Sequence, residues 1–138
     1  MKQTFISYSR KDKKFVDQMQ AILLEAGFKT WIDTQDIGVG TDWNEEIVGQ
    51  IKKSGAFILV ISSASVESPY VQFEYGVSQG VKLPVPVVPV QLEKVESPPH
   101  YLSRLHYLDF TEKYQWEKLV EHLETLKLKT SSIKPQIW

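Results

Sequence analysis

The 138-residue chain contains no cysteine. This absence excludes disulfide bridges, thiolate metal sites and cysteine nucleophiles together, and it is typical of proteins kept in a reducing compartment. The N-terminal segment MKQTFISYSRKDKK is too short in its apolar part for a signal peptide, and no apolar run in the chain reaches transmembrane length. We therefore expect a cytoplasmic protein with no membrane partner.

The sequence also lacks an excess of either charge. Sixteen Lys and Arg residues stand against 17 Asp and Glu residues, which gives a formal net charge of -1. This balance argues against a direct nucleic-acid or membrane-surface partner, because such partners select strongly basic surfaces. Binding specificity must then come from a local site. The length and the 42% apolar content suit one domain with a hydrophobic core.

Segments of strand and helix character alternate along the chain. Five strands are predicted, over residues 3–8, 28–33, 56–61, 87–91 and 106–110. Helices are predicted over residues 9–26, 42–51, 69–80 and 116–126, from apolar stripes and from capping residues. The run 56–61 (AFILVI) is apolar throughout, as in a central strand covered on both faces. Residues 129–138 are interpreted as a linker-like tail, and residues 1–128 as the domain.

This alternation predicts an α/β fold with three layers, in which helices cover both faces of an open parallel sheet. Five strands favour the flavodoxin-like order 2-1-3-4-5. Ligands bind such sheets beyond the carboxyl ends of the strands where the winding direction reverses, which here is between the first and third strands. The loops SYSR and SSAS, at residues 7–10 and 62–65, end those two strands.

The helix that follows the third strand carries one glutamate near its start. Ser68 offers an N-cap and Pro69 occupies the first helical position. Tyr70 and Glu74 are four residues apart, so they share one face of this helix. A glutamate on a helix is most often a solvated surface residue, and that interpretation stands beside a catalytic one.

Several uses of this architecture are unsupported. Ser62 and Ser63 stand where a phosphoryl-accepting receiver needs an aspartate, and SYSRKD is unlike a flavin-phosphate loop. Neither GxxxxGK[ST] nor GxGxxG occurs. The three histidines have no metal-ligand spacing and lie away from the serine loops, which also disfavours a Ser-His-Asp triad: His100, His106 and His122. We expect no metal and no cofactor.

Three segments together, FISYSRKD, WIDTQDIGVGTDW and ISSASVESPYVQFE, resemble a Toll/interleukin-1 receptor (TIR) domain of the bacterial kind. The resemblance implies the fold predicted above and cleavage of the nicotinamide–ribose bond of NAD+, with Glu74 as the catalytic residue. The motif W-x-x-x-E, common in bacterial members, appears here with Tyr70 in place of tryptophan, which keeps an aromatic wall with a polar tip.

Further residues are assigned by the same resemblance. Tyr8, Ser9 and Arg10 would contact the dinucleotide, and Trp43 would form an aromatic wall together with Tyr70. Residues 38–40, with Gly38 and Gly40, would let the loop after the second strand move over the pocket. A purely structural role is the alternative for each of these residues. It is packing for Tyr8, a solvated helix start for Arg10, a hydrophobic contact at the helix start for Trp43, and a simple turn for the glycines.

The chemistry explains why one carboxylate is enough. Glycoside hydrolysis usually needs two, because the leaving alkoxide must be protonated while the oxocarbenium-like centre is stabilised. Nicotinamide leaves as a neutral ring from a cationic pyridinium, so no acid is needed. One ionised glutamate can hold the ribose hydroxyls and offset the positive charge that develops on the sugar.

The expected function is therefore an NAD+ glycohydrolase that releases nicotinamide and ADP-ribose or a cyclic ADP-ribose isomer. Its roles would be immune-type signalling, antiphage defence or NAD depletion. The resemblance implies activation by self-assembly with other TIR domains, and a recognition domain or separate trigger protein as a further partner. A non-catalytic TIR–TIR adaptor is the alternative from another class, because possession of the fold does not decide function. Cleavage or exchange of the base on another nucleoside or nucleotide would use the same glutamate.

Overall fold

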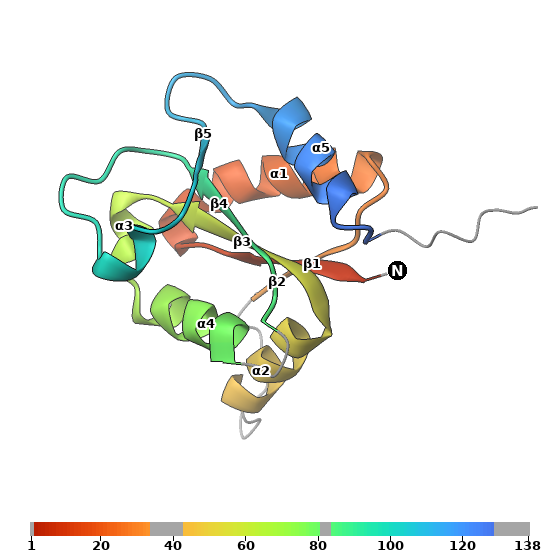
Figure 1. Cartoon of the computed structure of the whole chain (residues 1–138), viewed down its shortest axis with the longest axis horizontal. Helices are drawn as coiled ribbons and strands as arrows, with labels where there is room; N and C mark the ends of the chain where they lie inside the picture. Colours follow the sequence, from red (N-terminus) through yellow and green to blue (C-terminus); the bar gives the residue numbers. More distant parts are fainter. Residues whose placement is uncertain (1, 34–42, 81–83, 129–138) are drawn as a thin grey trace, which may run out of the picture.

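The computed structural model describes residues 2–33, 43–80 and 84–128 as one three-layer α/β domain (Figure 1). Five parallel strands form a sheet in the order β2-β1-β3-β4-β5, which confirms the predicted fold class and strand order. The strands are β1 (Gln3–Ser7), β2 (Thr30–Ile32), β3 (Ser54–Ile61), β4 (Val87–Gln91) and β5 (Leu108–Asp109). The helices are α1 (Lys13–Glu25), α2 (Trp43–Lys53), α3 (Ser63–Val66), α4 (Pro69–Gly80) and α5 (Trp116–Thr125), with 3-10 turns η1 (Arg10–Asp12) and η2 (His100–Leu102).

Helices cover both faces of the sheet, with α1 and α5 on one side and α2 and α4 on the other (Figure 1). The central strand β3 divides its side chains between two buried clusters, because successive residues of a strand point to opposite faces. Ala56, Ile58 and Val60 pack with residues of α1 and α5. Phe57 and its alternate neighbours in β3 pack with residues of α2 and α4. The all-apolar sequence of this strand follows from burial on both faces.

The second strand is shorter than predicted because its first residues close the preceding helix. Gly27 adopts a positive φ of 92°. Its N–H donates to the carbonyl of Leu24 at 3.0 Å, while the N–H of Phe28 donates to the carbonyl of Leu23 at 2.8 Å. These two bonds form a Schellman cap. The backbone of Phe28 is therefore committed to the helix end, and pairing with β1 starts at Thr30.

Two further boundaries differ from the prediction. Ser9 caps η1, accepting from the N–H of Lys11, and α1 begins at Lys13 rather than directly after Ser9. The last strand covers Leu108–Asp109 and not 106–110. The residues before it are held instead by η2, where the Tyr107 hydroxyl donates to the carbonyl of Leu102 at 2.8 Å.

The side-chain hydroxyl of Thr4 forms no hydrogen bond to any described residue. The residue is fully buried in β1, and its Oγ1 has no hydrogen-bond partner. A buried hydroxyl without a partner retains its desolvation cost. We expect Thr4→Val, which keeps the side-chain shape, to raise the free energy of unfolding by about 1 kcal/mol. Urea unfolding measures this change, and a loss of stability in the variant would show that the hydroxyl is paired after all.

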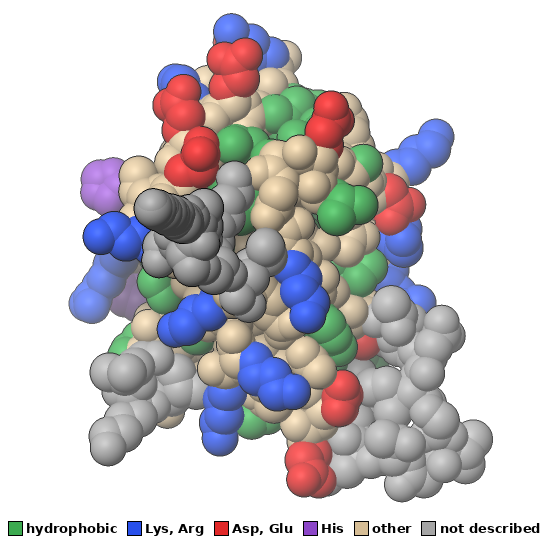
Figure 2. Space-filling model, turned by 90° about the vertical axis from the view of Figure 1, so that its right-hand side faces the viewer, with side chains coloured by type: hydrophobic (Ala, Val, Ile, Leu, Met, Phe, Trp, Pro, Cys, Tyr) green, Lys and Arg blue, Asp and Glu red, His purple; other side chains and the backbone are tan. Residues whose placement is uncertain are grey.

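The face at the amino-terminal ends of the strands carries charges of both signs (Figure 2). Among its described residues, Lys and Arg side chains are scattered with Asp, Glu and apolar side chains. This mixture agrees with the nearly balanced charge of the sequence. No helix within residues 2–33, 43–80 and 84–128 has the length and apolarity needed to cross a membrane.

Candidate functional site

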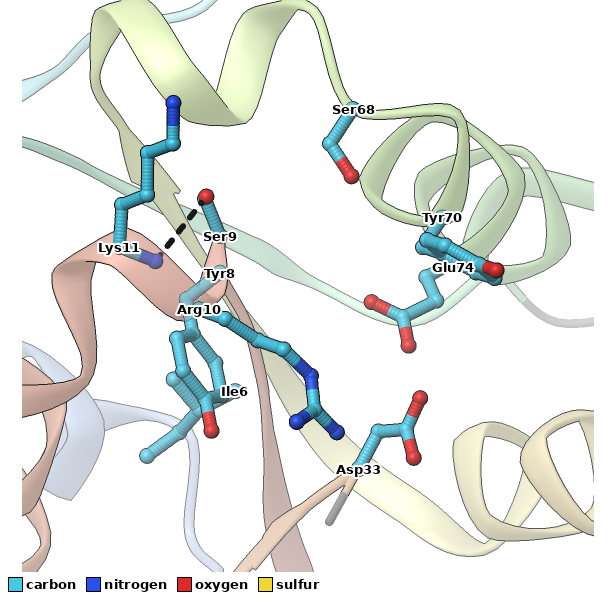
Figure 3. Close-up of a pocket in the computed structure, with 9 residues that line it drawn as sticks. All are labelled: Ile6, Tyr8, Ser9, Arg10, Lys11, Asp33, Ser68, Tyr70 and Glu74. Atoms are coloured by element: carbon cyan, nitrogen blue, oxygen red, sulfur yellow. Dashed lines mark hydrogen bonds between the residues drawn. The ribbon is translucent and has the colours of Figure 1, made fainter. Parts of the chain in front are cut away.

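A pocket of about 290 Å³ lies at the carboxyl ends of the strands, between the loop after β1 and the start of α4 (Figure 3). This is the edge at which the winding of the sheet reverses, since β1 has β2 on one side and β3 on the other. The pocket is lined by Ile6, Tyr8, Ser9, Arg10, Lys11, Asp33, Ser68, Tyr70 and Glu74.

Glu74 is the buried acid of this pocket. Only 3% of its surface is exposed, and its carboxyl group projects from α4 into the pocket (Figure 3). The hydroxyl of Ser7, the last residue of β1, donates to Glu74 Oε1 at 2.6 Å. The interpretation of Glu74 as an ordinary solvated helix residue is therefore wrong.

Burial changes the acidity of this carboxyl group. The pKa of Glu74 is raised to about 8, chiefly by desolvation on burial; the hydrogen bond from Ser7 opposes this rise, and the negative charge of Asp33 adds to it. Burial is the largest of these effects because a low-dielectric environment disfavours the charged form. A pKa raised in this way favours the protonated form of the carboxyl group near neutral pH.

The helix that carries Glu74 is held by local caps. Ser68 Oγ accepts from the N–H of Val71 at 3.3 Å, as the predicted N-cap requires. Before it, the short helix α3 begins with a capping box between Ser62 and Ser65, where the sequence predicts only a loop. Ser62 Oγ also donates to Asp12 Oδ2 at 2.5 Å. This bond ties the segment after β1 to the segment after β3.

The remaining walls combine aromatic rings with charged groups. The Arg10 guanidinium and the carboxyl groups of Asp33 and Glu74 point toward one another across the pocket (Figure 3). Tyr8 is half-buried, and burial raises the pKa of its phenol. Tyr70 is 52% exposed at the rim. The pocket thus combines the carboxyl groups of Asp33 and Glu74, the guanidinium of Arg10, and the aromatic rings of Tyr8 and Tyr70.

Most of the residues predicted from sequence meet here. Tyr8, Ser9, Arg10, Tyr70 and Glu74 all line the pocket. Ser9 accepts from the N–H of Lys11 at 3.3 Å, so its hydroxyl also serves a local cap. Gly38 and Gly40 lie outside the described residues, as does the side chain of Trp43, which is the first residue of α2.

Several residues of the site were missed by sequence reasoning, and two of these, Asp33 and Ser7, bear directly on Glu74. Asp33 follows β2 directly, so it shares the carboxyl edge of the sheet with the predicted loops, and this position was the available signal. Ser7 was named as part of the loop after the first strand, but its place beside Glu74 depends on the side of the sheet to which it points. A second carboxyl group, that of Asp33, therefore faces Glu74 in the pocket (Figure 3).

A metal site is not found in the described part of the chain. Within those residues, no group of three or more His, Cys, Asp or Glu side chains is arranged to hold a metal ion. Among the described residues, two carboxyl groups, Asp33 and Glu74, and two cationic side chains, Arg10 and Lys11, line the pocket.

Comparison with known proteins agrees with this architecture. The model of the TIR domain family matches residues 4–124. The crystal structure of the TIR domain of the Toll-related receptor TRR-2 from Hydra magnipapillata is 22% identical in sequence, with a TM-score of 0.75 over 90% of this chain and 99% of that one.

Two other solved structures share the fold. A prokaryotic SEFIR domain is 20% identical, with a TM-score of 0.63 over 100% of this chain and 99% of that one. A chain from the RPS4 and RRS1 TIR domain heterodimer is 16% identical, with a TM-score of 0.60 over 92% of this chain and 94% of that one. At these identities the likeness establishes the fold alone.

Proposed function

The chain belongs to the TIR domain family, and from this premise we propose that it is an NAD+ glycohydrolase that uses Glu74 as its catalytic carboxylate. It would cleave the bond between nicotinamide and ribose and release nicotinamide with ADP-ribose or a cyclic isomer. The single observation that carries this proposal is the carboxyl group of Glu74, 3% exposed and directed into a pocket at the carboxyl edge of the sheet. A buried carboxyl group with a strongly shifted pKa, placed in a pocket, is a mark of functional sites.

The charge of the substrate matches the unusual acidity of Glu74. The nicotinamide ring of NAD+ is a pyridinium cation, and a cation near a carboxyl group favours its ionised form. Binding of the substrate would therefore ionise Glu74 in the pocket. Cleavage then sends the electron pair of the C–N bond to the ring nitrogen, so that neutral nicotinamide leaves and positive charge appears on the ribose. The ionised carboxylate stabilises that charge in a site of low dielectric constant.

Hydrolysis is completed by water. A water molecule adds its oxygen to the ribose carbon that nicotinamide has left, and the proton it loses passes to the Glu74 carboxylate or to solvent. Formation of a cyclic isomer would instead use a nucleophilic atom of the substrate itself. In both cases one carboxylate is sufficient, because the leaving group departs without a proton.

The lining of the pocket supports the recognition of a phosphorylated riboside. Arg10 and Lys11 stand on one side and supply cations for phosphate groups. Tyr8 and Tyr70 supply ring faces for stacking. The volume of about 290 Å³ is at the lower end of the range of ligand pockets. It suits the nicotinamide–ribose part of NAD+, with the rest of the dinucleotide outside.

The adaptor alternative is favoured by a specific likeness, since the RPS4 and RRS1 TIR domains form a heterodimer. An adaptor surface would require no buried acid. Burial of the Glu74 carboxyl costs stability at neutral pH, and such a cost is typical of residues retained for activity. Self-assembly is compatible with both functions, and we propose that contact with further TIR domains activates this enzyme.

The pH dependence of the reaction tests this proposal. Because the ionised form of Glu74 is required and its pKa is raised to about 8, kcat/KM for NAD+ is expected to rise about tenfold per pH unit below that value and to level off above it. The rise of kcat with pH should occur at lower pH than the rise of kcat/KM, because the bound cation favours the ionised form of Glu74. Nicotinamide release is followed chromatographically from about pH 6 to pH 9. A kcat/KM profile that is flat or falls across this range would contradict the role of Glu74.

A further inference from the structure

We propose that Ser7 is a positioning residue for the reaction: its hydroxyl holds one carboxyl oxygen of Glu74 and leaves the other for the substrate. This inference rests on the proposed function, which it deepens by adding a residue that acts through Glu74. The observation behind it is the 2.6 Å hydrogen bond from Ser7 Oγ to Glu74 Oε1, in which both partners are buried.

The donor is fixed in place by the sheet. Ser7 ends β1, whose neighbours on either side are β2 and β3. It is in register with Leu59 of β3, and the preceding residue, Ile6, is in register with Ile32 of β2 and Ile58 of β3. Because side chains alternate along a strand, Ser7 points to the same face as Phe5, which packs with residues of α2 and α4. The position of this donor is therefore fixed by the sheet, unlike that of a residue in a loop.

The acceptor is held by a helix with a defined start. The N-cap at Ser68 sets the beginning of α4, and Glu74 falls on its buried face with Val71 and Ser78. The hydrogen bond therefore joins two rigid elements, and it fixes the rotation of the carboxyl group about its final bond. With Oε1 held by Ser7, Oε2 remains to accept from ribose hydroxyls or from the attacking water.

The hydrogen bond from Ser7 also affects the ionisation of Glu74. A hydroxyl that donates to a carboxylate favours the ionised form, and such charge-assisted bonds are stronger than neutral ones. Burial raises the pKa of Glu74 and the Ser7 bond opposes that effect in part. Ser7 therefore keeps the carboxyl group within reach of ionisation when the cationic substrate arrives. Without the hydroxyl, the same burial would hold Glu74 protonated at higher pH.

Other charged or titratable groups around Glu74 come from several elements. The segment after β1 supplies Tyr8, Arg10 and Lys11, the segment after β2 supplies Asp33, and α4 itself supplies Tyr70. The neighbouring helix α2 carries Glu45 and Glu46 in its first turn, and both are exposed. Among these, the negative charge of Asp33 raises the pKa of Glu74. A change at Ser7 leaves all of these charges in place, so its effect on Glu74 can be isolated.

The test compares Ser7→Ala with a matched control on the same strand. Thr4→Val also removes a fully buried hydroxyl from β1, but that hydroxyl has no hydrogen-bond partner. The titration midpoint of the Glu74 side-chain carboxyl is measured by 13C NMR in the wild type and in both variants. We expect the midpoint to rise by about one pH unit in Ser7→Ala and to stay unchanged in Thr4→Val. An unchanged midpoint in Ser7→Ala would overturn the proposal.

Kinetics supply the second readout. At a pH where Glu74 is ionised in all variants, Ser7→Ala is expected to lower kcat about tenfold or more with little change in KM, because a misplaced carboxylate loses transition-state contacts and not ground-state binding. Ser7→Thr, which keeps the hydroxyl, should restore most of kcat. A raised Glu74 midpoint with unchanged kcat would overturn the positioning role. If the wild type cleaves no NAD+, the NMR titration still decides whether Ser7 controls Glu74, so the two proposals fail separately.

Discussion

Replacing Glu74 with glutamine is expected to slow the release of nicotinamide from NAD+ by at least about 100-fold, the loss typical when one electrostatic stabiliser of a transition state is removed. Glutamine has the same shape as glutamate, and its carbonyl oxygen can accept the hydrogen bond that Ser7 now donates to Oε1. It lacks the negative charge, and its amide nitrogen takes the place of the second carboxyl oxygen, Oε2. The loss would therefore appear in kcat more than in KM, because the charge on the sugar develops in the transition state.

The matched control is Glu67→Gln, which makes the same chemical change at an exposed residue in the turn before α4. Its rate should equal that of the wild type. Equal loss in both variants would point to a general effect of charge on the protein. Release that survives Glu74→Gln in full would remove Glu74 from the mechanism.

The same substitution is expected to stabilise the fold. The pKa of Glu74 is raised from 4.5 to about 8 on folding. The folded state therefore binds a proton more tightly than the unfolded state, and ionisation works against folding. At about pH 9, Glu74→Gln should raise the free energy of unfolding by about 3 to 5 kcal/mol, because a tenfold change in proton affinity corresponds to about 1.4 kcal/mol.

The sign of this effect sets its pH range. Below the unfolded value of 4.5 both states of the wild type are protonated, and the contribution of Glu74 to stability is fully present. That contribution falls as the pH rises from 4.5 to about 8, and it stays lost above this range. Urea unfolding of both proteins at a series of pH values measures the difference. A difference that does not grow with pH would show that Glu74 titrates like an exposed glutamate.

A gain in stability together with a loss of activity would be informative. An adaptor that never ionises Glu74 in a pocket would gain stability from a neutral residue without any cost in function. The retention of an acid at this buried position is then explained by its chemistry. The gain in stability and the loss of activity in Glu74→Gln would therefore have one cause, the removal of an ionisable carboxyl group from the pocket.

The fold could be predicted because its signals are local and repeated. Alternation of strand and helix segments fixes a parallel sheet with crossovers, and the apolar run 56–61 identifies the strand at its centre. One predicted boundary failed where a backbone group had a competing local partner, since the N–H of Phe28 closes α1 rather than joining β2. The last strand is also shorter than predicted, and the side-chain hydroxyl of Tyr107, just before it, bonds to the carbonyl of Leu102.

The site could be predicted only in part, because side-chain direction depends on packing. The position of the loop at residues 7–10 follows from topology, whereas the assignment of Tyr8 and Arg10 as contacts of the dinucleotide came from the resemblance. The burial of Glu74 could not follow from hydrophobic periodicity, since the buried face of α4 has Val71 followed by the polar Glu74 and Ser78. A polar residue at a core position is itself a signal of function, because it contradicts the pattern that folding favours. Asp33 needed the alignment of β2 with β1 before it could be placed near that acid.

The most direct test of this account is the release of nicotinamide from NAD+ by the wild type and by Glu74→Gln at about pH 9, where Glu74 is ionised. Both proteins are assayed over a range of concentrations, up to those that promote self-assembly. We predict that the wild type releases nicotinamide, with a rate per molecule that grows with concentration, and that Glu74→Gln is at least about 100-fold slower at each concentration. Equal release by the two proteins, or none from the wild type at any concentration, would contradict the assignment of Glu74 as the catalytic residue of an NAD+ glycohydrolase.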